Sequence, residues 1–434
     1  MLKPQIKQDN LRWPMGGFCL ISALIYTSPF VGAWLNYIAL GLCLYRLVRY
    51  DRQIFNVDYC GLICLSIVFS TPSGLSCVVP LVLAAEIWFV FRDGLVIVPS
   101  FAVFLSLICY LLMRMQMSIN NFLLCVSQLL ILYMMVSWED RQSSILGIKV
   151  FISNVIISSI YALIFRNTSP IIRIIGQEVS AFWKSTQTRF QGLYRDPNYY
   201  MALIIMSLVL ITLLWFYHQL SGRFFLTGTA SLLIFGALTY SKTFFFLLCL
   251  FWLFCFLHIL RKSKWMGILF IVGTGVLAYI LVNTLFATTV FRILSASSIQ
   301  ELTTGRSSLF QIYLAKILSS ASSLLFGEGM AAEILELGTH NLYLEVLYYI
   351  GLLGFLLYFG FLGMLVFQVQ RNAHVQILSR GLFRYLAVIV FCALFCSLQG
   401  MYILPVYGLM YMSLISLHIP GTETCQEQIK QHFG

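Results

Sequence analysis

The chain has 434 residues, of which 60% are hydrophobic and only 10% are charged, and its mean hydropathy is +0.89. A soluble fold cannot bury that much apolar surface, so the composition excludes a soluble globular protein and predicts a helical membrane protein. The net charge of +11 does not indicate a nucleic-acid partner, because most basic residues flank apolar runs and no basic–aromatic RNA-binding pattern is present.

Apolar runs separated by polar clusters follow one another along the chain, and each predicts a membrane span. They cover residues 15–30, 32–48, 57–71, 74–91, 95–113, 119–137, 145–164, 199–217, 223–239, 243–260, 265–286, 342–367, 383–399 and 401–418. The first run has no small-residue cleavage site after it, so we expect it to be retained. We therefore expect an all-α polytopic membrane protein of about 12–14 transmembrane helices, forming a single membrane domain over residues 1–434.

Lysine and arginine are unequally divided between the two sides of these spans. If the N-terminus is cytoplasmic, the short outer turns hold only Arg114 and Lys242. The inner segments hold seventeen basic residues: Lys3, Lys7, Arg12, Arg46, Arg49, Arg52, Arg92, Arg141, Lys149, Arg223, Arg261, Lys262, Lys264, Arg371, Arg380, Arg384 and Lys430. Because short cytoplasmic loops are enriched in lysine and arginine, both termini are predicted to be cytoplasmic.

Two long segments, 165–198 and 287–341, lie outside the membrane in this topology and hold the other eight basic residues. Long loops largely escape the charge rule, so these residues need another explanation. Part of the second segment has an apolar face at helical spacing: Leu309, Tyr313 and Ile317. Thr303 or Thr304 could cap this helix, and the sequence FGEG at 326–329 would end it.

The first long segment ends in TRFQGLYRDPNYY, residues 188–200. Asp196 followed by Pro197 fits a helix start, with aspartate as the N-cap and proline at the first helical position. Helix capping does not explain Arg189 and Arg195. Two guanidinium groups beside a helix N-terminus could bind a phosphate-bearing ligand, although contact with lipid headgroups or a solvated loop is an equal alternative.

Two further cations occupy unusual positions. Lys242 lies in the short outer turn TYSKT, against the charge trend, although one lysine in contact with headgroups is common. Arg306 follows Gly305 at the start of the expected outer helix, where the helix dipole disfavours a cation. An anionic ligand would remove this conflict, whereas the simpler alternative is an ordinary charged first turn.

The sequence HNLYLE, residues 340–345, begins a long apolar run. Such polar groups are rare in membrane helices unless they have a function or a partner. Asn341 and Glu345 are four residues apart and share a helix face. His340 is the only one of six histidines that this topology places outside, and histidine exchanges protons near neutral pH. A catalytic base and a satisfied polar residue both fit this pattern.

Four stretches together resemble, in their order and spacing, the motifs of the O-antigen polymerase and O-antigen ligase family: RFQGLYRDPNYY, LTYSKTFFFLL, LTTGRSSLFQIYL with LLFGEGM, and HNLYLEVLYYIGLLG. They span about 188–358, and the hydropathy plan is similar along most of the chain. The resemblance implies a GT-C-like fold whose active-site region is formed by outer loops 165–198 and 287–341. It implies a metal-independent, inverting glycosyltransferase without a cofactor, whose donor glycan is carried by undecaprenyl pyrophosphate.

Carried over by motif, the resemblance implies donor-site cations at Arg189, Arg195, Lys242 and Arg306, with His340 at the reaction centre. Glu345 is a second catalytic candidate, and Asn198 and Asn341 are further substrate-binding candidates. Lys242 departs from the family pattern, in which arginine is common after that serine, and lysine cannot hold a phosphate in bidentate fashion. Cations that stabilise a departing pyrophosphate and a base that deprotonates the acceptor hydroxyl are what this transfer requires.

These inferences predict a polymerase of lipid-linked repeat units for O-antigen, capsule or exopolysaccharide in the bacterial inner membrane. It would contact membrane lipids and could act with a flippase and a chain-length regulator. The alternative is the ligase, which transfers the finished glycan to lipid A core or another acceptor. A lipid-linked oligosaccharide flippase or transporter is an alternative from another class; it is disfavoured by the absence of internal repeats and by the charges gathered in long outer loops.

Overall fold

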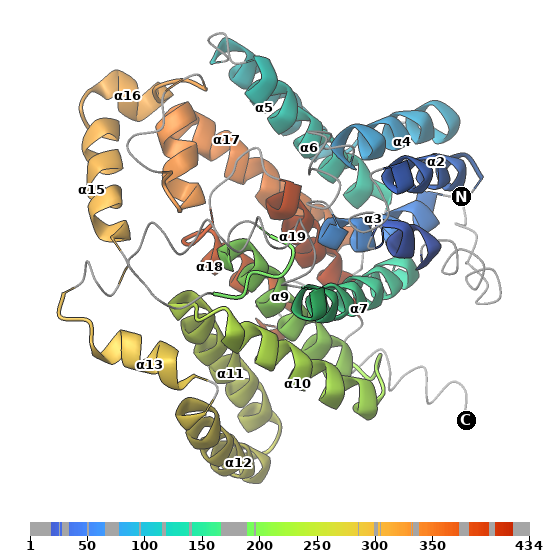
Figure 1. Cartoon of the computed structure of the whole chain (residues 1–434). Coiled ribbons are helices and arrows are strands. Elements are labelled where there is room, and N and C mark those ends of the chain that lie inside the picture. Colours follow the sequence, from blue (N-terminus) through green and yellow to red (C-terminus); the bar gives the residue numbers. More distant parts are fainter. Residues whose placement is uncertain are drawn as a thin grey trace.

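The computed structural model describes residues 19–25, 27, 34–49, 52–65, 78–94, 97–114, 119–138, 141–165, 189–194, 197–284, 286–298, 303, 305–330, 332, 338–372, 382–398 and 404–419. These residues form helices and turns, with no strand among them, which confirms the all-α class (Figure 1). The predicted first span, 15–30, and the first long segment up to residue 188 lie largely or wholly outside this part of the chain.

Each apolar run predicted from residue 32 onward overlaps a helix, although α3 covers 52–65 and the run predicted there covers 57–71. In chain order the elements are α2 (Trp34–Arg49), α3 (Arg52–Leu65), α4 (Val78–Asp93), α5 (Pro99–Met113), α6 (Ile119–Trp138), α7 (Arg141–Phe165), α9 (Pro197–Phe216), α10 (Gly222–Leu238), α11 (Lys242–Lys262), α12 (Lys264–Asn283), α13 (Ala287–Leu294), α15 (Arg306–Ile317), α16 (Ala321–Phe326), α17 (Leu342–Asn372), η3 (Leu382–Tyr385), α18 (Leu386–Leu394), α19 (Leu404–Ile415) and η4 (Ser416–His418). Within the described ranges, five of them, α7, α9, α11, α12 and α17, are long and apolar enough to cross a membrane. The chain thus has the helices that a multi-pass membrane protein requires.

Helix α9 is the centre of the bundle, and α12 is at its edge (Figure 1). The residues of α9 are apolar on every face and nearly all buried, because α7, α10, α11, α18 and α19 surround it. Helix α12 packs mainly on α11 and α13 and exposes Trp265, Leu269 and Tyr279. Exposure of such large apolar side chains suits a helix that faces lipid rather than water.

The packing of α18 shows which helix ends meet. In η3, directly before α18, the Phe383 ring stacks on His258 near the end of α11, with centroids 4.1 Å apart, and meets Phe216 at the end of α9 at 5.1 Å. From this point α18 packs along α9 and α11, so its end lies toward the starts of both helices. There the backbone N–H of Leu342 donates to the carbonyl of Phe395 at 2.8 Å, so α17 starts at the same place. We call this end of the bundle the motif end; α13, α15 and α16 lie on this side, and α2 and α4 on the opposite side (Figure 1).

Helix α17 is interrupted at Gly351, whose backbone angles are φ 64° and ψ −172°. Helix α17 covers the span predicted at 342–367, and the break at Gly351 divides it into two parts. Residues 342–350 form a separate half-helix, whose Tyr348 packs on Tyr313 of α15 and whose end meets the end of α16. The remainder of α17 runs along α5, where Phe361 meets Phe104 and Gln368 accepts from Ser100. At the motif end, the half-helix therefore runs in a different direction from the remainder of α17 (Figure 1).

Two buried ion pairs join the N-terminal helices at the opposite end of the bundle. Arg46 on α2 donates from Nε and Nη2 to the two carboxylate oxygens of Asp58 on α3, at 2.8 and 2.7 Å. Arg52 on α3 pairs with Glu86 on α4 and also donates to the Met134 carbonyl of α6. Both pairs link different helices, so they fix the mutual positions of α2, α3 and α4.

Candidate active site

The first motif is attached to the turn between α10 and α11. Arg189 Nε donates to the Thr239 carbonyl at 2.9 Å, and the Phe190 N–H donates to the Leu238 carbonyl at 3.0 Å. Thr239 is three residues before Lys242, the first residue of α11. The structure thus brings the cations of the first two motifs to the same helix start, although they are 53 residues apart in sequence.

Gly192 allows this segment to turn back on α9. Its φ is 56°, and a Cβ at this position would lie 2.5 Å from the Tyr200 ring. Phe190 meets the same ring edge-on at 5.4 Å, and the Tyr194 hydroxyl donates to the Ile63 carbonyl at 3.0 Å. A glycine is needed at residue 192 because both the left-handed backbone and the close approach of an aromatic ring exclude a side chain.

Helix α9 begins with Pro197, as predicted from the Asp-Pro pair. Asn198 follows in the first turn and is buried. Arg195 and Asp196 lie outside the described residues, so the structure does not place the second guanidinium group of this motif.

The start of α11 combines a tight turn with positive charge. The Ser241 hydroxyl is the N-cap and accepts from the Phe244 N–H at 3.3 Å, while Tyr240 adopts a positive φ of 48°. Lys242 occupies the first helical position and is partly buried. A cation at a helix N-terminus is unfavourable on its own, since the helix dipole is positive there. With Arg189 close by, this helix start is suited to hold an anion.

Helix α15 has the predicted amphipathic face, with Leu309, Tyr313 and Ile317 buried. The N-cap is Gly305 rather than either threonine predicted for this role, but the Thr303 hydroxyl still accepts from the Ser307 N–H at 3.2 Å. Arg306 is the first helical residue, directly after Gly305 at φ 80°. The prediction that FGEG ends this helix is wrong, because α15 already ends at Ile317 and FGEG ends the short helix α16.

The start of α17 is held by its own polar residues. Asn341 Oδ1 accepts from the Leu344 N–H at 3.1 Å, so this asparagine is a helix cap. The Thr339 hydroxyl donates to the Asn341 carbonyl at 3.0 Å. Between them, His340 adopts a positive φ of 46°, which is uncommon for a residue with a side chain and is concentrated at functional sites.

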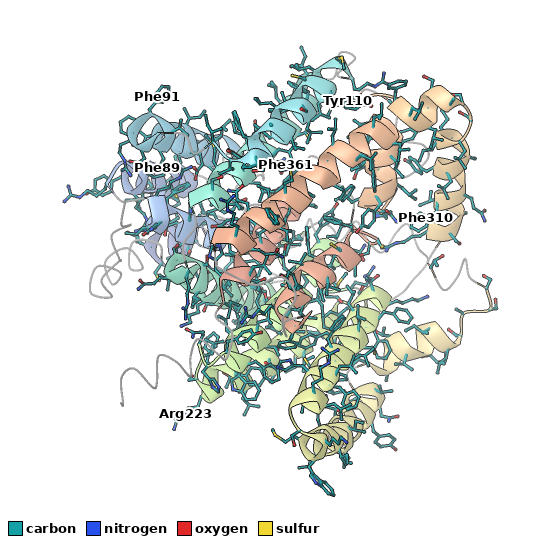
Figure 2. The ribbon with its side chains drawn as sticks, turned by 180° about the vertical axis from the view of Figure 1, so that it is seen from behind. Phe89, Phe91, Tyr110, Arg223, Phe310 and Phe361 are labelled. Atoms are coloured by element: carbon teal, nitrogen blue, oxygen red, sulfur yellow. The ribbon has the colours of Figure 1, made fainter. Side chains whose placement is uncertain are left out.

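Helix α15 and the half-helix 342–350 lie side by side in both views (Figures 1 and 2). The rings of Tyr313 and Tyr348 meet edge-on with centroids 5.0 Å apart. Each tyrosine lies seven residues beyond a polar residue near its helix start, Arg306 in α15 and Asn341 before α17. Because both helices end beside α16, they run in the same direction. Arg306 and His340 are therefore placed at corresponding ends of two parallel helices.

Glu345 is 8% exposed and lies one turn inside the half-helix. Its carboxylate is within electrostatic range of Tyr349, Tyr358 and Cys125. This environment places Glu345 toward the interior of the bundle. The candidate residues thus lie at two places on the motif end: Arg189 and Lys242 at the start of α11, and Arg306 and His340 at the starts of α15 and α17. Helix α18 connects the two places, because it packs on α11 and its Phe395 carbonyl accepts from the first residue of α17.

The Asn341 cap follows a recognisable pattern, an asparagine immediately before an apolar helix. The Thr239 carbonyl that accepts from Arg189, by contrast, has no local sequence signal, because every residue has a backbone carbonyl. No family model matches the chain, and no curated protein and no solved structure is significantly similar to it. Among the described residues, no group of three His, Cys, Asp or Glu side chains is placed to hold a metal ion.

Proposed function

We propose that the chain is a polysaccharide polymerase that transfers a growing glycan from undecaprenyl pyrophosphate to a hydroxyl group of a lipid-linked repeat unit. One observation carries this proposal: segments far apart in sequence bring Arg189, Lys242, Arg306 and His340 to one end of an apolar helical bundle. Arg195 belongs to the same motif as Arg189 and is included in the proposed donor site. Cations beside helix starts suit a pyrophosphate, and a histidine among them suits proton transfer.

In this proposal the bundle is a GT-C-like membrane protein of about 12–14 spans in the bacterial inner membrane. The motif end faces outward, both termini are cytoplasmic, and the outer segments form the active-site region. The asymmetry of lysine and arginine supports this orientation. The donor reaches the site from the membrane, since its carrier is a lipid.

The proposed reaction is a single displacement. The acceptor oxygen bonds to the anomeric carbon as the bond from that carbon to the pyrophosphate oxygen breaks, so the configuration inverts. The hydroxyl proton passes to His340, and the electron pair of the broken bond leaves with the pyrophosphate. Arg189, Lys242 and Arg306 stabilise the charge on this leaving group, which requires no metal or cofactor. Asn198 and Asn341 are the proposed neutral substrate contacts.

The test uses purified protein in vesicles with lipid-linked repeat units and measures elongation and donor affinity separately. Because His340 has a positive φ, alanine would change the backbone as well as the chemistry, so His340→Asn and His340→Gly are the better variants. We expect elongation to fall roughly 10²–10⁴-fold with donor affinity largely retained. His218→Asn is a matched control, because His218 has a similar φ of 57° at the opposite end of the bundle.

Each other outcome changes the proposal in a defined way. Elongation near the wild-type rate in both His340 variants would remove His340 as the base and make Glu345 the first alternative. Loss of donor binding would instead assign His340 to the pyrophosphate site. Transfer to lipid A core but not to a second repeat unit would identify the ligase activity, and movement of the lipid-linked unit across the vesicle without transfer would identify a flippase.

A further inference from the structure

The break in α17 leaves three backbone carbonyls without their usual partners inside the helix. Each one finds a donor from elsewhere in the chain. The Glu328 N–H donates to Tyr348 at 2.8 Å, the Gly329 N–H donates to Tyr349 at 2.9 Å, and the Tyr110 hydroxyl donates to Ile350 at 2.7 Å. A buried carbonyl is costly to leave unpaired in an apolar bundle, so these bonds stabilise the end of the half-helix.

Two glycines make this contact possible. Gly327 has a φ of 74° and Gly351 a φ of 64°, and their backbones pack directly against each other. A Cβ on Gly327 would lie 2.5 Å from the Gly351 nitrogen, and one on Gly351 would lie 2.4 Å from the Gly327 nitrogen. Segment 327–329 therefore binds the break backbone to backbone, and we call it the clamp segment.

The end of α5 holds the clamp segment in turn. Arg114 Nη2 donates to the Gly327 carbonyl at 2.7 Å, and the Arg114 carbonyl accepts from the Met330 N–H at 3.1 Å. Tyr110 lies one turn earlier on α5, where this helix meets α17 (Figure 2). One helix end thus contacts both the clamp segment and the broken helix.

The half-helix depends on these contacts for its position. Residues 342–350 make only about two and a half helical turns, too few to be stable alone. His340 lies at one end of this short helix and the clamp at the other. The clamp segment also follows α15 and α16, so the same contacts attach the helix that begins with Arg306.

We propose that Tyr110 and Arg114 are positioning residues for the proposed transfer. They hold the clamp segment on the break in α17, and so keep His340 and Arg306 in a fixed relation at the starts of two parallel helices. This inference rests on the proposed function for its consequence in catalysis, but the clamp itself can be measured without any substrate.

The experiment combines hydrogen–deuterium exchange with kinetics on the purified full-length protein. Exchange at the Glu328 and Gly329 amides reports the clamp directly, because these are the groups that bond to the half-helix. Tyr110→Phe removes only the hydroxyl, and Arg114→Met removes the guanidinium donor but keeps most of the side-chain length. The matched control is Tyr385→Phe, whose hydroxyl accepts from Gln370 Nε2 at 2.9 Å at the other end of α17.

We expect both α5 variants to raise amide exchange at the clamp roughly five- to tenfold, as loss of one hydrogen bond does. We expect kcat for elongation to fall by a similar factor while KM for the donor changes less than twofold. Arg114→Lys keeps a donor to the Gly327 carbonyl and should recover part of both effects. Tyr385→Phe should change neither.

Unchanged exchange in both variants would overturn the inference, because α5 would then not hold the clamp. Faster exchange with an unchanged kcat would also overturn it, since the clamp would be structural and the proposed function would stand. If wild-type protein transfers no glycan at all, the proposed function and the positioning role fall together, and the exchange data still decide whether α5 holds the clamp.

Discussion

The substitution Gly351→Ala tests the break in α17 most directly. The backbone at φ 64° and ψ −172° is in a region that only glycine adopts readily, at about 1–3 kcal/mol for any other residue. The added Cβ would also lie 2.4 Å from the Gly327 nitrogen and 2.5 Å from the Phe326 nitrogen. Backbone atoms cannot move aside as a flexible side chain can, so the clamp segment must shift.

This shift would break the two backbone hydrogen bonds between the clamp segment and the half-helix, each contributing about 0.5–1.5 kcal/mol. With the backbone strain, the expected loss is about 2–6 kcal/mol in the free energy of unfolding. Gly360→Ala is the control on the same helix, since a Cβ there meets no atom within 4 Å. It should leave stability unchanged or raise it by up to about 1 kcal/mol.

Both variants can be compared by reversible unfolding in mixed micelles with increasing denaturing detergent, followed by tryptophan fluorescence. Thermal unfolding, measured in parallel, should also show that Gly351→Ala is less stable than Gly360→Ala. Equal stability of Gly351→Ala and Gly360→Ala would refute the reasoning, because it would mean that α17 accommodates a side chain at its break without displacing the clamp.

Further outcomes follow from the ion pairs, the orientation and the donor site. Glu86→Gln would leave Arg52 buried with its charge uncompensated and should cost about 3–5 kcal/mol, whereas Arg52→Met with Glu86→Leu should be far milder in the same unfolding assay. A tag inserted at Ser320 should be reachable by a membrane-impermeant label in intact cells, and one at Ser263 should not; the reverse pattern would invert the proposed topology. Arg306→Lys should elongate more slowly than wild type but faster than Arg306→Ala, whose loss of one charge-assisted contact should be about 2–4 kcal/mol, or about 30- to 1000-fold in rate.

The helix positions were predictable because they depend on local properties of the chain. Apolar runs locate the helices, Pro197 starts α9, and the spacing of Leu309, Tyr313 and Ile317 identifies the buried face of α15. Each of these features depends only on residues within a few helical turns, through the geometry of proline or the spacing of apolar side chains.

The break in α17 was not predictable in the same way. Apart from Glu345, the run from residue 342 is apolar, and its glycines 351, 354, 360 and 363 look equivalent in sequence. Only Gly351 faces another backbone, which comes from a segment 24 residues earlier, whereas Gly360 and Gly363 meet open space. The decisive contact is between backbones, and no side chain marks it.

The same limit applies to the candidate site. Motif residues indicated which side chains to consider, but Asn341 was expected to contact substrate, and the structure gives it the additional task of capping α17. One partner of Arg189 is the backbone carbonyl of Thr239, and a backbone carbonyl carries no chemical signature in the sequence. Which carbonyl pairs with a distant cation depends on how the helices pack. The local spacing of apolar residues does not predict that packing.

The buried ion pairs of α2, α3 and α4 have a consequence for how the protein is built. Arg46 and Asp58 are on neighbouring helices, as are Arg52 and Glu86, so each helix has a charge that only another helix can neutralise. A buried charge that loses its partner costs about 3–5 kcal/mol. These pairs can therefore form only after all three helices have been synthesised, so the final arrangement of this part of the bundle is an assembly step and not a property of any single helix.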